Sequence, residues 1–245
     1  MRRSVTVNTT IGLIAVFGMF GMLSGALAQE PPAQMVAPLF VKVDWVRPAS
    51  QEDTSLRYTP AQANIADPNV EIHYYGPGAK QILTTGNPGS DVRPYGVWTG
   101  TAEGPFAITF GMKNGNYVDL TGLANVRWFT KTSGFHVVRP VVKLADGTLL
   151  VGDRTFSSVP KLTLSEFSLT DIRWIKLEPE RMVTVNSGRS PANEVWAPNP
   201  DLTRVAEVGF ADLYPGSGHG TGGYIHLAGI EVYGKTVPRG ARSSR

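Results

Sequence analysis

Short runs of alternating apolar and polar residues recur along the chain, and none extends to a helical period over twelve or more positions. The runs are rich in β-branched and aromatic residues, and Gly, Pro, Asn or Asp separates each run from the next. This pattern is typical of an all-β domain. We therefore expect about ten strands, at residues 39–46, 70–76, 106–112, 125–131, 135–145, 148–154, 161–169, 171–178, 204–214 and 224–234.

Turn and breaker residues refine this pattern. Asp146 and Gly147 accept the positive φ angles of a tight hairpin, so they predict a turn between the runs at 135–145 and 148–154. Pro140 interrupts the first of these runs and predicts an edge strand or a bulge there. About ten strands without a helix predict an all-β, two-sheet antiparallel jelly-roll sandwich.

Two long segments, residues 47–69 and 186–203, carry no strand pattern. Loops of this length in a compact domain are either functional or disordered. The second segment contains Trp196, which is costly to leave in solvent. We expect Trp196 either to pack on the core or to offer a stacking face to a ligand.

One local pattern occurs twice, as "NVRWF" at 125–129 and "DIRWI" at 171–175. On a strand, successive side chains point to opposite faces, which places the arginines Arg127 and Arg173 opposite the adjacent tryptophans. Two interpretations are open. The tryptophans are buried and the arginines exposed, or the arginines line a concave face that holds an anionic or hydroxyl-rich ligand.

Three stretches of the chain resemble a known family. "YVDLTGLANVRWFTK" (117–131) followed by "FHVVRPVVKLADGT" (135–148) resembles the middle of galactose-binding-like β-jelly rolls, and "GGYIHLAGIEVYG" (222–234) resembles their last strand. The resemblance spans about residues 97–234 and implies a layout like that of non-catalytic carbohydrate-binding modules. Many such modules use an acidic residue near the last strand to hold a structural calcium. Ala228 stands at that place here, so we do not carry a metal site over.

The first 28 residues have the three parts of a secretory signal peptide. Arg2 and Arg3 give a positive start, residues 11–23 are apolar, and Ala26 and Ala28 supply the small residues before a cleavage site. We expect Sec export to the periplasm or exterior, with no stable membrane insertion after cleavage. A retained N-terminal anchor is the alternative. The expected organisation is therefore a signal peptide at 1–28, one domain at 29–234 and a basic flexible tail at 235–245.

The basic balance of the whole chain, 23 Lys and Arg against 20 Asp and Glu, comes from its two ends. Two arginines lie in the signal region and four basic residues in the tail, which leaves 17 basic residues at 29–234 against 20 acidic ones. Such a body lacks the positive surface that nucleic acid requires, so no nucleic-acid partner is expected. The chain has no cysteine, which excludes disulfides, thiolate catalysis and cysteine-bound metals.

The glycine-rich stretch "LYPGSGHGTGG" (213–223) has neither the lysine nor the following helix of a phosphate-binding loop, and a strand follows it. We interpret it as the connection between the last two strands, at the rim of the sandwich. Two chemical alternatives stay open. Histidines from distant strands can assemble a metal site, and two carboxylates can meet in a cleft for glycoside hydrolysis. The candidate carboxylates are Glu71, Glu166, Glu207, Asp212 and Glu231.

The favoured function is a secreted, non-catalytic binding module for a saccharide or another polyol, without a cofactor or metal; the pattern assigns no oligomeric state. The alternatives are a glycan hydrolase or lyase on the same scaffold, and a structural or protein-interaction domain. An aromatic-lined cleft would favour the module, and a buried carboxylate or histidine pair in that cleft would favour the enzyme. The candidate ligand-binding residues are Trp98, Tyr95, Trp196 and Tyr214 for stacking, and Arg139, Asp212 and His219 for hydroxyl groups.

Overall fold

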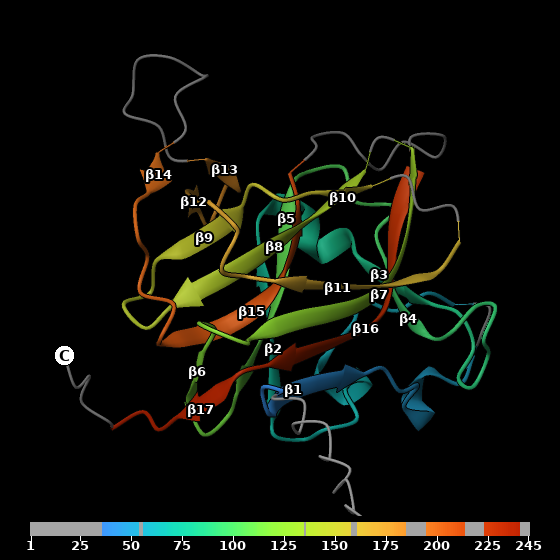
Figure 1. The fold of residues 1–245 in the computed structure, drawn as a ribbon. Coiled ribbons are helices and arrows are strands. Elements are labelled where there is room, and N and C mark those ends of the chain that lie inside the picture. Colours follow the sequence, from blue (N-terminus) through green and yellow to red (C-terminus); the bar gives the residue numbers. More distant parts are fainter. Residues whose placement is uncertain are drawn as a thin grey trace, which may run out of the picture. The chain divides into compact units, whose positions relative to one another are not determined.

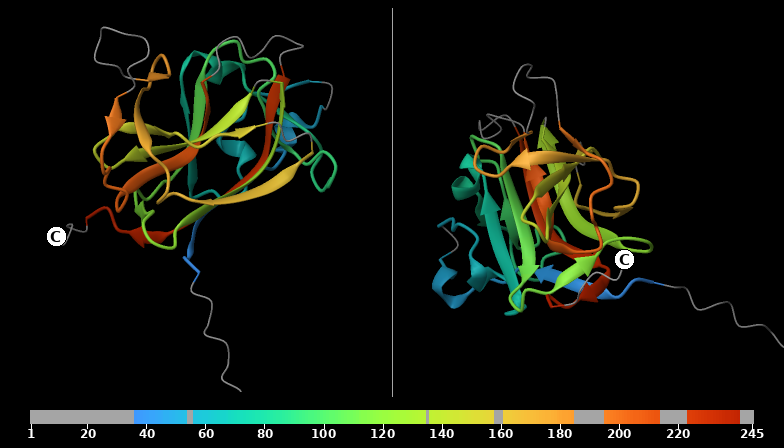
Figure 2. Two further views of the ribbon diagram at one scale, coloured as in Figure 1. Left: turned by 45° about the horizontal axis from the view of Figure 1, so that its top comes forward. Right: turned by 90° about the vertical axis from the view of Figure 1, so that its left-hand side faces the viewer.

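The described chain is built from β-strands in two antiparallel sheets, which confirms the predicted all-β sandwich (Figure 1). The further views in Figure 2 show the strands of the two sheets on either side of the core. Within the described residues, no helix has the length and apolar character needed to cross a bilayer. The computed structural model describes residues 36–53, 56–134, 136–157, 161–184 (without the Thr184 side chain), 195–213 and 223–240.

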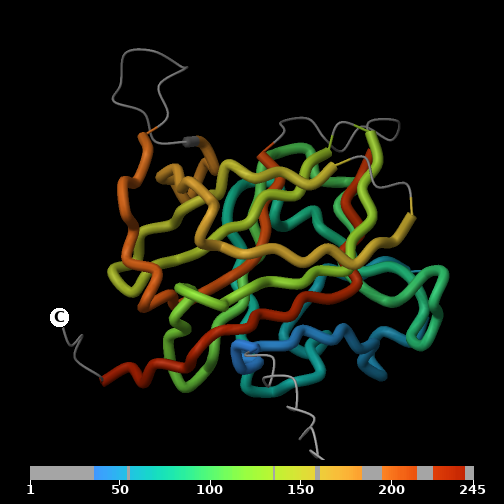
Figure 3. The backbone as a smooth tube through the Cα atoms, viewed as in Figure 1, coloured from blue at the N-terminus to red at the C-terminus, as the bar shows by residue number. Residues whose placement is uncertain are grey.

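The smaller sheet has six described strands and is centred on β7 (Asn125–Gly134) and β16 (Gly223–Tyr233). Their register shifts between Leu227 and Gly229, which places a β-bulge at Ala228. The blue and red tubes of Figure 3 show the first strand, β1, beside β16, although the two are far apart in sequence. The remaining strands are β1 (Leu39–Asp44), β3 (Leu83–Thr85), β4 (Gly96–Trp98) and β11 (Thr163–Ser168).

The larger sheet has eleven described strands, in the main order β13-β12-β9-β8-β15-β5-β2. Short strands extend it, because β10 pairs with β8, β14 with β12, β6 with β15 and β17 with β6. Their bounds are β2 (Val70–Tyr75), β5 (Phe106–Met112), β6 (Tyr117–Asp119), β8 (Val137–Leu144), β9 (Leu149–Gly152), β10 (Phe156–Ser157), β12 (Trp174–Glu178), β13 (Val183–Thr184), β14 (Trp196–Ala197), β15 (Val205–Asp212) and β17 (Lys235–Val237). Three short 3-10 helices also occur in the described chain, η1 (Ala49–Gln51), η2 (Gln62–Asn64) and η3 (Pro77–Gln81).

The paired strands run three residues past the domain boundary expected at residue 234. Residues 235–237, expected in the flexible tail, form β17 and pair with β6. The predicted signal peptide at 1–28 and the last tail residues, 241–245, lie outside the described residues.

Pro140 lies in an interior strand, so of the two expectations, an edge strand or a bulge, the edge strand is wrong. One side of β8 pairs with β15, and the other side pairs with β9 and β10. On that second side the pairing is interrupted, because β9 pairs as far as Val141 and β10 resumes at Val138. The proline, which has no backbone N–H to donate, lies at this interruption.

Alternation along the strands decides which side chains enter the core between the sheets. Phe106 on β5 and Phe210 on β15 are fully buried and meet edge to face, with their ring centroids 6.2 Å apart. Trp128 on β7 is equally buried and packs on Phe167 of β11, with 4.5 Å between the ring centroids. Aromatic rings of this size contribute much of the apolar burial that stabilises the sandwich.

The repeated Arg-Trp pattern follows the first interpretation. Trp128 and Trp174 are buried in the core, and the preceding arginines point away from it. Arg127 lies on the smaller sheet and pairs with Glu166, while Arg173 precedes β12 of the larger sheet. The two arginines therefore do not line one concave face.

The close approach of β15 to β5 gives a test of the packing. A Cβ atom at Gly209 would lie 2.0 Å from the Ile108 carbonyl oxygen and 2.6 Å from the Thr109 Cα, and these backbone atoms cannot swing aside. We expect Gly209→Ala to lower the free energy of unfolding by roughly 3 kcal/mol, which is large for overpacking. Chemical denaturation monitored by fluorescence measures this change.

Gly229→Ala is the matched control, because Gly229 also lies in a strand and a Cβ atom there would have only the Val43 carbonyl oxygen nearby, at 3.5 Å. We expect the control to change stability by much less. Equal losses of stability in the two variants would contradict the close approach of β15 to β5.

Candidate ligand-binding sites

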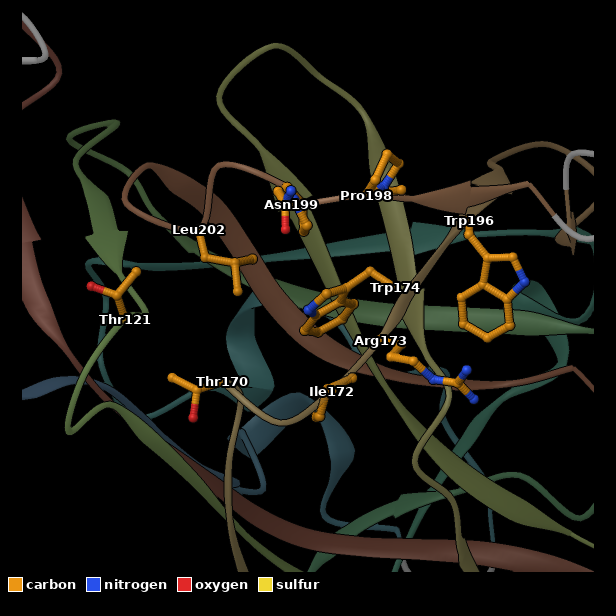
Figure 4. Close-up of a pocket in the computed structure, with 11 residues that line it drawn as sticks. Thr121, Thr170, Ile172, Arg173, Trp174, Trp196, Pro198, Asn199 and Leu202 are labelled. Atoms are coloured by element: carbon orange, nitrogen blue, oxygen red, sulfur yellow. The ribbon is translucent and has the colours of Figure 1, made fainter.

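A cavity of about 640 Å³ opens beside the pairing of β12 with β14 (Figure 4). Its volume lies in the range of small-molecule sites. Two tryptophans line it, together with one charged residue and several small polar or proline residues. The lining residues are Thr121, Thr170, Ile172, Arg173, Trp174, Trp196, Ala197, Pro198, Asn199, Pro200 and Leu202.

Trp196 is the more exposed of the two rings of this cavity, and a positively charged side chain lies against it. The residue is 40% exposed, and the Arg173 guanidinium carbon lies 4.6 Å from its ring centroid. Asp153 holds this arginine, because Arg173 Nε donates to Asp153 Oδ2 at 2.7 Å and the Arg173 backbone N–H donates to Oδ1 at 3.0 Å. The result is an aromatic platform that is oriented before any ligand arrives.

The surroundings of the Asp153 carboxylate favour its ionised form. Partial burial on its own would raise the pKa of Asp153, but the hydrogen bonds and charge of Arg173 outweigh it and lower the pKa. Asp153 is therefore ionised near neutral pH and keeps Arg173 in place. The Arg173 side chain is 75% exposed, so the pair contributes mainly orientation rather than stability.

The sequence "APNPD" at 197–201 explains the shape of one cavity wall. Pro198 and Pro200 restrict the backbone, and Asn199 between them has a φ of 49°, in the left-handed region that asparagine tolerates better than most residues. The end of the wall is attached to the residue after β6, since the Leu120 backbone N–H donates to the Leu202 carbonyl at 2.8 Å. The wall is thus held by backbone constraints as well as by packing.

Trp174 forms part of the inner surface of the cavity. In Figure 4 the nitrogen-bearing edge of its indole is turned toward the side where Thr121 and Leu202 lie, with Trp196 on the other side. Its Nε1 is buried and has no hydrogen-bond partner among the described residues. Trp45 and Trp128 share this property in the core, so the unpaired indole nitrogen does not by itself identify a ligand site.

The described lining of this cavity offers aromatic faces and hydrogen-bonding groups. Arg173 is its single charged lining residue among the described residues, and no carboxylate or histidine belongs to the lining. The two indoles offer apolar faces, and the hydroxyl, amide and guanidinium groups around them offer hydrogen bonds. General acid–base catalysis needs a titrating group beside the reacting atoms, and the described lining supplies none.

A buried carboxylate is found elsewhere, on the outer face of the larger sheet. Glu207 accepts hydrogen bonds from the Tyr75 hydroxyl at 2.7 Å, from Lys143 Nζ at 2.9 Å and from the Thr109 hydroxyl. Burial alone would raise the pKa of Glu207, but these hydrogen bonds outweigh it and lower the pKa. His73 adds its charge when protonated, with Nε2 3.9 Å from the carboxylate. Glu207 is therefore an ionised acceptor with several donors, unlike the general acid that glycoside hydrolysis needs.

The predicted site residues are distributed over several places. Trp196 lines the cavity described above. Tyr95 is buried, and its hydroxyl donates to Gln51 Oε1 at 3.1 Å. Trp98, on β4, lies under the guanidinium of Arg57, whose Cζ is 4.7 Å from the ring.

The polar members of the predicted set also lie apart from Trp196. Asp212 is fully buried, with its Oδ2 2.6 Å from His136 Nδ1. Arg139 Nε donates to the Gly152 carbonyl at 2.9 Å, where the pairing of β8 is interrupted. Tyr214 and His219 lie outside the described residues. The described members of the set therefore do not share one cavity.

Sequence reasoning did not select Trp174, Asn199 or the pairing of Arg173 with Trp196 as parts of a site. The "DIRWI" motif did single out the arginine, and the segment at 186–203 drew attention to Trp196. Neither pattern shows that β14 pairs with β12, which is the contact that brings Trp196 to Arg173.

No family model matches the chain, and neither does any curated protein. The family 11 carbohydrate-binding module of the cellulosomal cellulase Lic26A-Cel5E of Clostridium thermocellum is similar in structure, with a TM-score of 0.39 and 14% identity over 68% of this chain and 88% of that one. The family 11 module from the same organism, in complex with a β-1,3-1,4-mixed-linked tetrasaccharide, gives a TM-score of 0.38 and 16% identity over 68% and 89%. PfGH50B gives a TM-score of 0.37 and 11% identity over 68% of this chain, which spans only 22% of PfGH50B.

These neighbours include carbohydrate-binding modules, the class that the sequence resembles. At such low TM-scores and identities, however, the superpositions transfer neither a site nor an activity to this chain. The function proposed below therefore rests on the geometry of this chain's own cavities.

His226, next to Trp98 across the β16–β4 pairing, gives a test of the electrostatics on the smaller sheet. Burial, together with the smaller effect of the Lys131 and Arg93 charges, lowers its pKa to about 4, although a hydrogen bond to the Pro94 backbone acts in the opposite direction. We expect the ring signals of His226 to titrate at about pH 4 in NMR spectra of the folded protein. Lys131→Gln should raise this pKa, because it removes one of the two cations.

The same shift has a consequence for stability. An unfolded histidine binds a proton below about pH 6.5, whereas folded His226 stays neutral down to about pH 4. The stability that depends on neutral His226 is therefore complete above about pH 6.5 and is lost as the pH falls toward 4. His226→Gln should flatten this part of the stability curve. A native His226 that titrates near pH 6.5 would contradict the burial of its ring.

Proposed function

We propose that this chain is a secreted, non-catalytic module that binds a saccharide in the cavity lined by Trp196. The observation that carries the proposal is the half-exposed Trp196 ring, held against Arg173 at a cavity of about 640 Å³. A sugar ring presents a face of C–H groups and a rim of hydroxyl groups. An indole face matches the first, and the hydroxyl, amide and guanidinium groups of the lining match the second.

The rigidity of the cavity supports binding of a ligand without a large conformational change. The Asp153 carboxylate holds Arg173, and the prolines around Asn199 fix the opposite wall. A preorganised site loses little conformational entropy on binding, which favours affinity even for a weakly interacting ligand such as a sugar. Export rests on the sequence pattern of residues 1–28.

A glycan-active enzyme is the second candidate, and one observation favours it. Glu71, His73 and Glu207 line a cavity of about 190 Å³, where His73 Nε2 lies 3.6 Å from Glu71 Oε2 and 3.9 Å from Glu207 Oε1. The hydrogen bonds that hold Glu207 ionised weigh against a general acid at that position. We therefore place the enzyme second and include an activity screen in the test.

The test is a glycan array probed with the mature chain, followed by calorimetric titration of the glycans that bind. We expect Trp196→Ala to lower the affinity at least about tenfold, the effect of losing roughly 1.4 kcal/mol of stacking. Trp196→Phe, which keeps a smaller flat ring, should retain part of the affinity. An activity screen on the same glycans should show no turnover.

Leu164→Ala is the control, because Leu164 on β11 is a 61% exposed apolar residue outside the cavity. Its affinity should equal that of the wild type, and circular dichroism should show that each variant is folded. An array without hits would refute saccharide binding. Full affinity in Trp196→Ala would refute this cavity as the site.

A further inference from the structure

A second cavity, of about 370 Å³, lies where η1 and the segments after it meet the turn that follows β3. It shares no lining residue with the cavity of Trp196. Its charged lining residues are Arg47, Arg57, Arg93 and Asp53, which gives the lining three positive charges against one negative charge. This excess contrasts with residues 29–234 as a whole, in which acidic residues outnumber basic ones.

We propose that this cavity binds an oxyanion, namely a sulfate, phosphate or carboxylate group, either free or carried by a glycan. Each of these groups presents two or more oxygens in the geometry that a guanidinium fork recognises. The proposal does not depend on saccharide binding at Trp196, because the two cavities have no residue in common.

Arg47 is the best-fixed arginine of the three. Its Nη2 donates to the Gly86 carbonyl at 2.6 Å, and its Cζ lies 5.0 Å from the ring centroid of Tyr95. The Tyr95 ring is itself held, since its hydroxyl donates to Gln51 Oε1 and accepts from Asn64 Nδ2, both at 3.1 Å. One hydrogen bond and one ring contact leave further N–H groups of the Arg47 guanidinium for a ligand.

Arg57 and Arg93 are more exposed and complete the positive lining. The guanidinium of Arg57 lies over the Trp98 ring, which orients it without using its hydrogen-bond donors. Within the described residues, none of the three lining arginines forms an ion pair with a carboxylate. By contrast, Arg127 and Arg173 on the sheet surfaces each have a carboxylate partner within 2.9 Å.

The positive charge of Arg93 also acts on a residue beside the cavity. Burial is the main cause of the low pKa of the nearby His226, whose Nε2 is buried and has no partner among the described residues, and the positive charges of Lys131 and Arg93 lower that pKa further. An oxyanion in the cavity would neutralise part of the Arg93 charge.

The experiment is an NMR titration of the folded protein with inorganic sulfate and with inorganic phosphate, at constant ionic strength set by chloride. We expect saturable shifts at the backbone amides around Arg47, Arg57 and Arg93. Arg57→Gln and Arg93→Gln should each weaken anion binding about tenfold, since each removes charge-assisted hydrogen bonds. Arg57→Lys should also bind weakly, because it keeps the charge but loses the planar fork.

Arg154→Gln is the matched control, because Arg154 also lies over an aromatic ring, with its Cζ 5.4 Å from the Phe156 ring centroid, but is not part of the cavity lining. It should bind the anions like the wild type, and so should Trp196→Ala. Shifts that do not saturate, or an equal loss in Arg154→Gln, would overturn the proposal. Dextran sulfate and oligogalacturonate form the second arm: tighter binding than inorganic sulfate or acetate identifies a glycan-borne group, and equal binding identifies the free anion.

Discussion

Burial between the two sheets is the interaction on which the rest of the structure depends. The chain has no cysteine, so no disulfide links the sheets, and aromatic side chains such as Phe106, Phe210 and Trp128 fill the space between them. Alternation along each strand then sends polar and charged side chains to the outer faces or the ends of the sandwich. Both candidate ligand cavities lie at the border of this core, because Trp174 and Tyr95 belong to the core and also line a cavity.

Much of the fold follows from the sequence, because alternation over five or more residues is a strong signal. Each of the ten expected runs overlaps an observed strand, from β1 to β16. Strands such as β3 and β4 have only three residues, too few for alternation to distinguish them from loops. Pro140 shows another limit, since a local rule about hydrogen-bond donors cannot tell an edge strand from an interior strand whose neighbour changes at that residue.

The candidate sites were harder to anticipate, because they depend on contacts between distant segments. Trp196 stands out in the sequence because a tryptophan in a loop is unusual, but its partner Arg173 lies just before another strand, β12. Tyr95 was selected for its ring, and the structure buries that ring beneath Arg47 and engages its hydroxyl with Gln51. The residue types indicate that aromatic and cationic side chains contribute to the candidate sites. Only the strand pairing decides which of these side chains contact one another.

The exposure of Trp196 also has an optical consequence. The chain has five tryptophans; Trp45, Trp128 and Trp174 are buried, and Trp98 is partly covered by Arg57. Trp45 and Trp128 are buried and line neither cavity, whereas Trp196 stands at the mouth of a cavity beside the Arg173 guanidinium and Trp174 forms part of its inner surface. The protein therefore carries two intrinsic fluorophores at that cavity, and a ligand bound there would change their emission without any added label.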